Sequence, residues 1–298
     1  MRQRLSFTTG LLLSIPPVLW AGNAIIGRLV RDAMPPMTLN LLRWSIALFI
    51  LLFLGRAALR PGSGLLRNWR RYALLGLLGI GLYNSMQYLA LTTSSPLNVT
   101  LVASGVPVWM LLVGRFFYDV PVKGRQIGGA VLSIAGVLVV MCRGSLAELA
   151  ALRLVAGDLI MIVATIVWSF YSWSLMQKND VPALRADWAA FLLAQVAYGV
   201  LWSAALAGGE WALGTPQIVW SWPLAGALLY LAIGPAIIAM RCWGAGVQRA
   251  GPGISAFFIN LTPLFTALLS AAFLGELPQL YHVAAFGLIV GGIVVSAR

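Results

Sequence analysis

Residues 96–117 read PLNVTLVASGVPVWMLLVGRFF, and residues 252–274 read PGISAFFINLTPLFTALLSAAFL. In each stretch an apolar run begins at a proline and meets a second proline eleven residues later, at Pro107 and at Pro263. The two copies lie 156 residues apart, about half the length of the chain. Because proline lacks an amide hydrogen and clashes with the preceding helical turn, matched prolines in matched apolar stretches indicate a shared structural requirement. We interpret the chain as a tandem duplication, with repeats at 1–147 and 148–298.

The composition identifies the solvent of this protein as lipid. Hydrophobic residues make up 60% of the chain and charged residues only 9%, and apolar runs recur along its whole length. Such runs reach about 20 residues, the length that crosses a hydrocarbon core as a helix. They lack the alternation of a membrane β-strand, and backbone amides in lipid must be satisfied within the segment, so we predict an all-α polytopic membrane protein. The ten predicted spans are 8–30, 36–55, 72–91, 96–117, 125–142, 157–177, 187–207, 223–246, 252–274 and 279–297.

The distribution of cationic residues predicts the orientation of these spans. If the N-terminus is cytoplasmic, fourteen of the Lys and Arg residues lie toward that side and four toward the other. Cytoplasmic loops are enriched in these residues, so we predict that both termini are cytoplasmic. Five spans in each repeat then place the second repeat upside down relative to the first. The net charge of +12 is an ordinary topology signal near anionic lipid, and no nucleic-acid partner is implied.

Helix-breaking residues cluster at one predicted depth, near the middle of the bilayer. Ser104 and Asn260 each lie three residues before the second proline of their stretch, so the repeats place a small polar group at the same point. Irregular backbone at this depth is tolerated where it is buried in protein or lines a wet cavity, and paired interrupted spans are a signal for a transporter's binding site. The alternative is that the prolines only bend helices for packing. We predict a central cavity between the inverted repeats, with hinge or gating residues at Pro107, Gly234, Pro235 and Pro263.

Aromatic and polar side chains recur in the predicted spans at helical spacing. Asn23 follows Trp20 by three residues and Gln87 follows Tyr83 by four, so each pair lies on one helix face. Unpaired polar groups are expensive in hydrocarbon, so we expect these faces to point inward, where they either join helices or contact cargo. The candidate substrate-binding residues are Trp20, Asn23, Tyr83, Gln87, Ser104, Trp168, Tyr171 and Asn260.

Charged residues are rare inside the predicted spans. Arg43 lies in the second span, whereas Asp158, Arg241 and His282 lie nearer the ends of theirs. Without a carboxylate at the middle of the bilayer, a cation site or a proton relay is not supported, and the cargo is expected to be neutral or zwitterionic. Arg43 could have a functional role, or it could simply bind backbone carbonyls.

Enzymatic chemistry is not supported by the sequence. One His, two distant Cys and no phosphate-binding loop provide neither a catalytic set nor a metal site, so no catalytic residue, metal or cofactor is predicted. The GxxxG spacings at Gly124 and Gly128 and at Gly287 and Gly291 predict close helix packing.

The duplicated pattern resembles a known family. Each copy has a proline-centred helix, an acidic turn at Asp119 or Glu276, and a glycine-rich helix, and the second span carries Leu42-Arg43-Trp44. This layout resembles the drug/metabolite transporter superfamily with two EamA-type repeats, and its aromatic core is similar to the YddG-type aromatic amino acid exporters. The resemblance implies ten helices in two inverted five-helix repeats, and export of amino acids and other metabolites across the bacterial inner membrane.

We expect the protein to work as a monomer and to transport a small-molecule substrate, most simply an amino acid, by alternating access. The lipid bilayer is its other partner. Two alternatives stay open. The cargo could be a drug or another flat metabolite such as a nucleobase, or the protein could be a membrane scaffold or sensor without flux.

Overall fold

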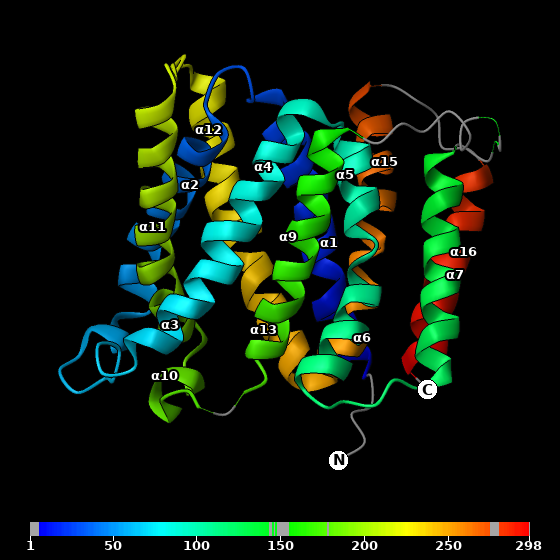
Figure 1. Ribbon diagram of the computed structural model, residues 1–298, viewed down its shortest axis with the longest axis horizontal. Helices are drawn as coiled ribbons and strands as arrows, with labels where there is room; N and C mark the ends of the chain where they lie inside the picture. The colour runs from blue at the N-terminus through cyan, green and yellow to red at the C-terminus, as the bar shows by residue number, and fades with distance from the viewer. Residues whose placement is uncertain are drawn as a thin grey trace.

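The computed structural model describes residues 6–142, 145, 147, 155–177, 179–274 and 280–297, and the regular secondary structure in these residues is helical (Figure 1). The first half contains α1 (Phe7–Leu29), α2 (Pro36–Leu54), η1 (Arg56–Leu59), α3 (Trp69–Gly76), η2 (Leu77–Leu82), α4 (Tyr83–Thr93), α5 (Pro96–Ala103), α6 (Val106–Phe117) and α7 (Gly124–Met141). The second half contains α9 (Ala156–Ser174), α10 (Pro182–Ala186), α11 (Trp188–Leu213), α12 (Trp222–Leu231), η3 (Ala232–Ile238), α13 (Ala239–Ala250), α14 (Pro252–Ile259), α15 (Leu261–Leu274) and α16 (Leu280–Ala297).

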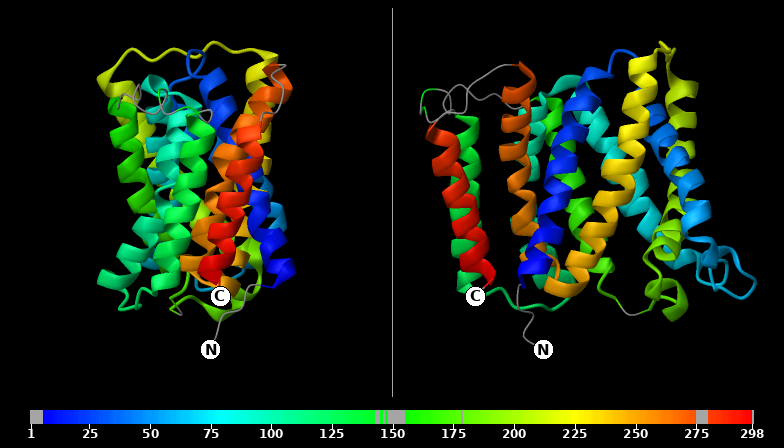
Figure 2. Two further views of the ribbon diagram at one scale, coloured as in Figure 1. Left: turned by 90° about the vertical axis from the view of Figure 1, so that its right-hand side faces the viewer. Right: turned by 180° about the vertical axis from the view of Figure 1, so that it is seen from behind.

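Eight helical stretches in the described residues are long and apolar enough to cross a membrane, and two shorter apolar helices cover 124–139 and 283–297. The all-helical membrane protein predicted from the composition is therefore confirmed. In Figures 1 and 2 these helices lie roughly side by side, and α1 begins at the same end of the bundle at which α16 ends. We call this the lower end, after its place in Figure 1, and the opposite end the upper end.

Two of the long stretches change from α-helical to π-helical geometry partway along. The wider turns are η2, between α3 and α4, and η3, between α12 and α13. Their first residues, Leu77 and Ala232, lie 155 residues apart, which is within one residue of the interval between the proline-centred stretches. Pro235 lies inside η3, where it has no amide hydrogen to donate, and Gly79 is its counterpart in η2. π-Helical turns are rare and frequently lie at functional sites.

The two proline-centred stretches are broken helices in the structure. The first breaks at Ser104 and Gly105, between α5 and α6, and the second breaks at Asn260, between α14 and α15. In the packed bundle α5 contacts α15, and α6 contacts α14. Helices α1 and α9 both pack against these half-helices, so the breaks lie inside the protein.

Helices α7 and α16 form a pair that is packed through glycine. A Cβ added at Gly129 would lie 2.6 Å from the carbonyl oxygen of Gly292, and one added at Gly136 would lie 2.8 Å from that of Ala285. The predicted packing role of the two GxxxG spacings is wrong, because a Cβ at Gly124, Gly287 or Gly291 would meet nothing within 4 Å and one at Gly128 only a side-chain carbon at 4.0 Å. Gly128 directly precedes Gly129, and about 100° per residue turns it off the contact face.

At the upper end, the first turn of α2 is capped by a residue from a distant helix. Pro35 at the N-cap position has no side-chain oxygen, and the carboxylate of Glu210 in α11 takes that role. It accepts hydrogen bonds from the Met37 amide at 3.0 Å, the Thr38 amide at 2.9 Å and the Thr38 hydroxyl at 2.7 Å. A carboxylate at a helix N-terminus satisfies the orphan amides and complements the helix dipole. Helices α2 and α11 also pack along their length.

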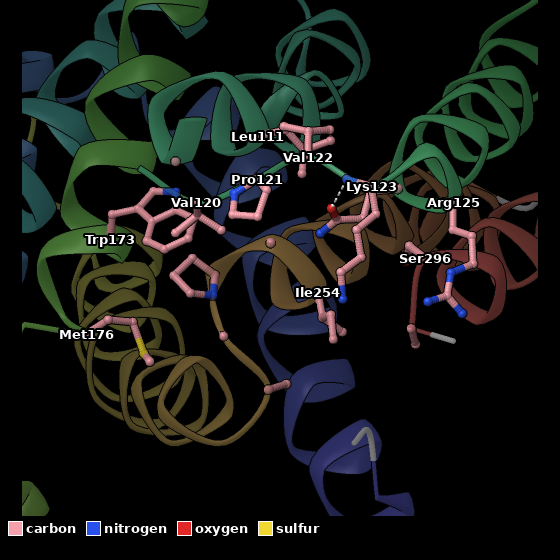
Figure 3. Close-up of a pocket in the computed structure, with 17 residues that line it drawn as sticks. Leu111, Val120, Pro121, Val122, Lys123, Arg125, Trp173, Met176, Ile254 and Ser296 are labelled. Carbon is pink, nitrogen blue, oxygen red and sulfur yellow. Dashed lines mark hydrogen bonds between the residues drawn. The ribbon is translucent and has the colours of Figure 1, made fainter. Parts of the chain in front are cut away.

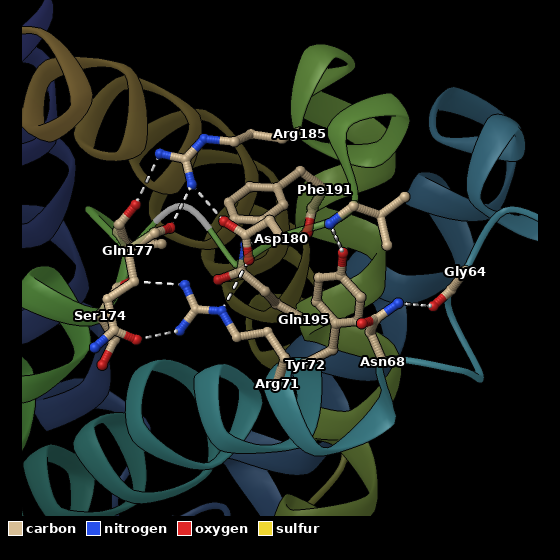
Figure 4. A network of polar contacts seen from close by, with 12 residues as sticks. Gly64, Asn68, Arg71, Tyr72, Ser174, Gln177, Asp180, Arg185, Phe191 and Gln195 are labelled. Atoms are coloured by element: carbon tan, nitrogen blue, oxygen red, sulfur yellow. Dashed lines mark hydrogen bonds and ion pairs between the residues drawn. The ribbon is translucent and has the colours of Figure 1, made fainter.

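A buried ion cluster joins helices at the lower end (Figure 4). The Asp180 side chain is fully buried and pairs with the Nε atom of Arg71 at 2.8 Å and with Arg185. Arg71 also donates to the carbonyl of Ser174, the last residue of α9, at 2.5 Å. Removing one member of such a cluster would leave buried charge uncompensated. The cluster therefore fixes the start of α3 against the segment that links α9 to α10.

Candidate functional site

Five aromatic side chains from four helical stretches meet inside the bundle, and we call them the ring cluster: Trp20, Tyr83, Trp168, Tyr171 and Trp243. Trp168 is at its centre. Its ring centroid lies 4.6 Å from that of Tyr83, 5.0 Å from Tyr171, 5.3 Å from Trp20 and 5.6 Å from Trp243. These spacings are those of favourable tilted and edge-on aromatic pairs. The structure thus brings together all four aromatic residues of the predicted site.

The local sequence explains why the rings converge. Trp168 and Tyr171 are three residues apart on the buried face of α9, and Tyr83 begins α4 where η2 ends. A Cβ added at Gly79 would lie 2.6 Å from the ring of Tyr171, so the absence of a side chain there allows the ring to pack against η2. The π-helical turn and its glycine therefore position Tyr83 and Tyr171 together.

Several polar donors in the ring cluster have no hydrogen-bond partner among the described residues. The Trp168 indole is 2% exposed, and its Nε1–H is buried and unpaired. No hydrogen bond joins the Trp20 Nε1–H or the Tyr83 hydroxyl to another described residue, whereas Trp243 donates to the Ser172 hydroxyl at 3.3 Å and Tyr171 donates to Gln195 at 2.9 Å. Buried polar groups are normally paired, so unpaired donors mark places where another molecule, water or ligand, completes the bonding.

Accessible surface remains on the inward face of α1. The exposed residues Leu11, Ile15, Val18 and Leu29 define its outward face. At about 100° per residue, Trp20 lies on the opposite side of the helix, yet it is partly exposed. Its accessible surface therefore faces the interior of the bundle. The rings otherwise pack closely in this region, and the central cavity expected from the sequence stays a prediction.

A polar network lies one turn from the ring cluster, and we call it the Arg43 network. Asn23 donates to the Gln87 Oε1 atom at 3.0 Å, which links two predicted site residues across α1 and α4. The Asn23 Oδ1 atom accepts from Arg43 at 2.8 Å and from the Tyr88 hydroxyl at 2.7 Å. Arg43 is 1% exposed and also donates to Asn84 at 3.0 Å and to Tyr88. Its guanidinium carbon lies 4.9 Å from the Trp44 ring centroid and 5.4 Å from that of Tyr88.

Ser104 and Asn260 lie at the helix breaks, and no described hydrogen bond or ring contact joins them to the ring cluster. Ser104 is 2% exposed and ends α5. Asn260 is fully buried, and neither atom of its side-chain amide has a partner in the described chain. The nearby Thr262 hydroxyl is also buried and unpaired. These groups form a second set of unsatisfied polar atoms, where α14 meets α15.

The four predicted hinge residues all lie in or beside irregular backbone. Pro107 is the second residue of α6 and Pro263 the third residue of α15, each just after a break. Gly234 and Pro235 are buried inside η3. Their role as hinges stays a prediction.

A cavity of about 910 Å³ opens at the lower end of the bundle (Figure 3). Lys123 and Arg125 line it on one side, and Trp173 and Met176 at the end of α9 line it on another. The Trp173 indole donates to the Met110 carbonyl at 2.8 Å and stacks on Tyr118 at a centroid distance of 5.3 Å. Trp173 lies five residues beyond Trp168, or about 7.5 Å along the helix. Trp173, which lines the cavity, therefore lies roughly one and a half turns below Trp168.

Other charged residues in the spans have local structural partners. Asp158 is 1% exposed, accepts from the Ser94 hydroxyl at 2.5 Å, and accepts from the Val155 amide at 2.8 Å. Arg241 lies over the Trp188 ring, with 4.3 Å between the guanidinium carbon and the centroid. The side chain of His282 lies outside the described part of the structure. All of Glu276 lies outside it as well. No cluster of residues in the described chain could hold a metal ion.

Sequence reasoning missed three members of the site. Trp243 was not predicted, although a tryptophan well inside an apolar run is itself a signal. Asn84 and Tyr88 adjoin Tyr83 and Gln87 in the sequence but face Arg43. Their role depends on how α2 packs against α4, which single-helix periodicity does not reveal.

Comparisons with known proteins agree with this architecture. A family model described as the EamA-like transporter family matches residues 8–142 and 155–298. An uncharacterized transporter of Archaeoglobus fulgidus is 28% identical over 97% of this chain and 95% of its own. The aromatic amino acid exporter YddG of Ancylobacter novellus is 24% identical over 98% of both chains, and a probable amino-acid metabolite efflux pump of Salmonella typhimurium is 24% identical over 96% of this chain and 94% of its own. A solved crystal structure shares the fold, with a TM-score of 0.74 at 24% identity over 97% of this chain and 96% of that one.

Proposed function

Because this chain belongs to the EamA-like transporter family, and is thus a membrane transporter rather than an enzyme, we propose that it exports aromatic amino acids or similar small zwitterions by alternating access. The observation that carries this proposal is the ring cluster with its unpaired donors. Flat apolar surface suits an aromatic side chain, while the unpaired donors suit the polar end of the same molecule. The names of two relatives, an aromatic amino acid exporter and a probable amino-acid metabolite efflux pump, support this choice.

We further propose ten membrane spans arranged as two inverted five-helix repeats, in a bacterial inner membrane and with both termini in the cytoplasm. The recurrence of both kinds of irregular backbone supports this arrangement: η2 with η3, and the break at Ser104 with the break at Asn260. Helices α1 and α9, which begin the two repeats, run in opposite directions in Figure 1. Lys123 and Arg125 at the lower end agree with a cytoplasmic face there.

In this mechanism the structure is a state closed at its centre, and the lower cavity is the cytoplasmic vestibule. Movement of the half-helices about the breaks at Ser104 and Asn260 would open a path from the vestibule to the ring cluster. Irregular backbone at matched positions in two repeats is the usual location of a transporter's binding site and of the hinges around it. One chain contains every group in this scheme, so a monomer suffices.

The test is efflux of radiolabelled aromatic amino acids from proteoliposomes that contain the full-length protein. Tyr83→Phe removes an unpaired hydroxyl, so flux should fall about 3- to 10-fold with little change in unfolding temperature. The matched control is Tyr198→Phe, because the Tyr198 hydroxyl donates to the Leu65 carbonyl at 3.3 Å and lies outside the ring cluster. Equal flux in both variants would remove Tyr83 from the site.

A second arm tests Asn260→Ala, which should reduce flux without loss of folded protein because its amide has no described partner. Competition by a panel of amino acids, purines and drugs then defines the cargo. Flux of purines or drugs alone would contradict the amino acid proposal, and binding without any flux would favour a scaffold or sensor.

A further inference from the structure

Arg43 carries a buried positive charge that has no carboxylate partner in the described chain. The ion pairs of the described residues involve Arg31, Arg71 and Arg185. The buried carboxylates are engaged elsewhere, because Asp180 binds two arginines and Asp158 binds Ser94 and caps α9. The partners of Arg43 are neutral amide and phenol groups and two aromatic rings. A cation inside a membrane bundle is costly and usually marks a functional site.

The charge of Arg43 determines which way the neighbouring amides point. A guanidinium can only donate hydrogen bonds, so Asn23 must present its Oδ1 atom to it. The Asn23 Nδ2 group then donates to Gln87, which must present its Oε1 atom. The acceptors of both amides are thereby used on the side of Arg43. The Gln87 Nε2–H₂ group is the last group in this series of hydrogen bonds, and it has no hydrogen bond to a described residue.

Within the ring cluster and the Arg43 network, the groups left for a ligand are therefore mostly donors. Gln87 Nε2, Trp20 Nε1 and Trp168 Nε1 can only donate, and the Tyr83 hydroxyl can donate as well. Gln87 lies one turn from Tyr83 on α4, and its partner Asn23 lies one turn from Trp20 on α1. Gln87 Nε2 and the field of Arg43 thus act on the ring cluster from the side on which Asn23 and Gln87 lie. Donors backed by a buried positive charge suit an anion and repel a cation.

We infer that the ring cluster and the Arg43 network together select ligands by a carboxylate on an aromatic body, and that the ammonium group of an amino acid is not required. This inference rests on the proposed transport function and names the chemical class that the same site accepts. An aromatic monocarboxylate should bind at least as tightly as the matching amino acid, whereas the matching amine should bind weakly. Arg43 acts as a positioning residue, through Asn23 and Gln87 and through its charge, and not by contact with the ligand.

The experiment uses three ligands with the same indole ring: 3-indolepropionate, tryptophan and tryptamine. Binding is measured by thermal shift of the full-length protein in detergent, and efflux is measured from proteoliposomes. We expect 3-indolepropionate and tryptophan to bind at least 10-fold more tightly than tryptamine. Tryptamine binding as tight as that of the propionate would overturn the inference. This arm uses the unmodified protein, so it does not depend on whether a variant folds.

Variants then assign the preference to Arg43. Arg43→Gln should reduce the propionate-to-tryptamine ratio to within about 3-fold, and Arg43→Lys, which keeps the charge, should retain most of it. The control is Arg31→Gln, since Arg31 lies on the surface beside Asp32 and outside the site. A folded Arg43→Gln protein with an unchanged ratio would refute the role of Arg43. Absence of flux for all three ligands would instead count against the proposed transport function. Equal flux of all three would leave transport intact and overturn only the charge preference.

Discussion

Two tryptophans of the ring cluster differ in whether the indole N–H has a hydrogen-bond partner, and this difference gives a testable prediction. Trp168 and Trp243 are both buried, at 2% and 0% exposure, and their ring centroids lie 5.6 Å apart. The Trp243 Nε1–H donates to Ser172 at 3.3 Å, whereas the Trp168 Nε1–H has no described partner. Replacing either residue by Phe removes similar volume from the same region. The loss of packing should therefore destabilise the two variants by similar amounts. The remaining difference in their stability comes from the indole N–H.

The magnitude follows from hydrogen-bond energetics. Trp243→Phe loses a neutral hydrogen bond, which contributes about 0.5–1.5 kcal/mol to stability. Trp168→Phe removes a buried unpaired donor, whose burial costs about 1–3 kcal/mol. Trp168→Phe should therefore be more stable than Trp243→Phe by about 2 kcal/mol. For ligand binding the order reverses, because of these two tryptophans only Trp168 has an indole N–H free to bond the ligand. Its loss should weaken affinity about 3- to 10-fold.

The assay is unfolding of the detergent-solubilised protein, followed with and without an aromatic amino acid or carboxylate. Trp168→Phe should show the higher stability without ligand and the smaller stabilisation when ligand is added. Equal destabilisation by the two substitutions would refute the reasoning, because it would mean that the Trp168 N–H has a partner of its own in the folded protein and is not available to a ligand.

Three further predictions concern the frame around the site. Gly79→Ala should destabilise the protein by about 1–3 kcal/mol and reduce flux, because its new Cβ would lie 2.6 Å from the Tyr171 ring, whereas Gly10→Ala, with nothing within 4 Å, should be neutral or slightly stabilising in thermal unfolding. Asp180→Asn should lower the free energy of unfolding by about 3–5 kcal/mol, since it leaves buried Arg71 unpaired, and an unchanged midpoint would contradict that account. Single cysteines placed near the start of α1 and the end of α16 should react with an impermeant reagent from the same side of the membrane, and a cysteine in the loop between α1 and α2 from the other side.

Much of the fold was predictable because hydrophobic length is a direct consequence of the bilayer. The boundaries of α1 and α2 agree with the predicted spans to within one or two residues. The matched prolines predicted irregular backbone, and the breaks at Ser104 and Asn260 lie where they were expected. The π-helical geometry of η2 was not predicted, since it contains no proline and its glycines alone do not distinguish a wide turn from a close helix contact.

The site was predictable only in part. The aromatic residues could be found because each lies on the inward face of its own helix, a property of local periodicity. The Arg43 network could not, because it depends on how α1, α2 and α4 pack together, and the pairing of Asn23 with Gln87 spans 64 residues. The same limit explains the GxxxG error: spacing marks a face of small residues, but neighbouring helices decide which face is used, here that of Gly129 and Gly136.

The carboxylate of Glu210 at the amino end of α2 has a mechanical consequence. Four hydrogen bonds join α2 to α11 at the upper end. Three of them are accepted by the Glu210 carboxylate, and the Trp211 indole donates the fourth to the Thr38 hydroxyl at 2.9 Å. The two helices should therefore move as one rigid body during any conformational change. A passage at the upper end must then open at a different helix–helix interface. One candidate lies between α1 and α12, where the Tyr230 hydroxyl donates to the Leu19 carbonyl at 3.1 Å and the Val219 amide, just before α12, donates to the Ala33 carbonyl at 2.8 Å.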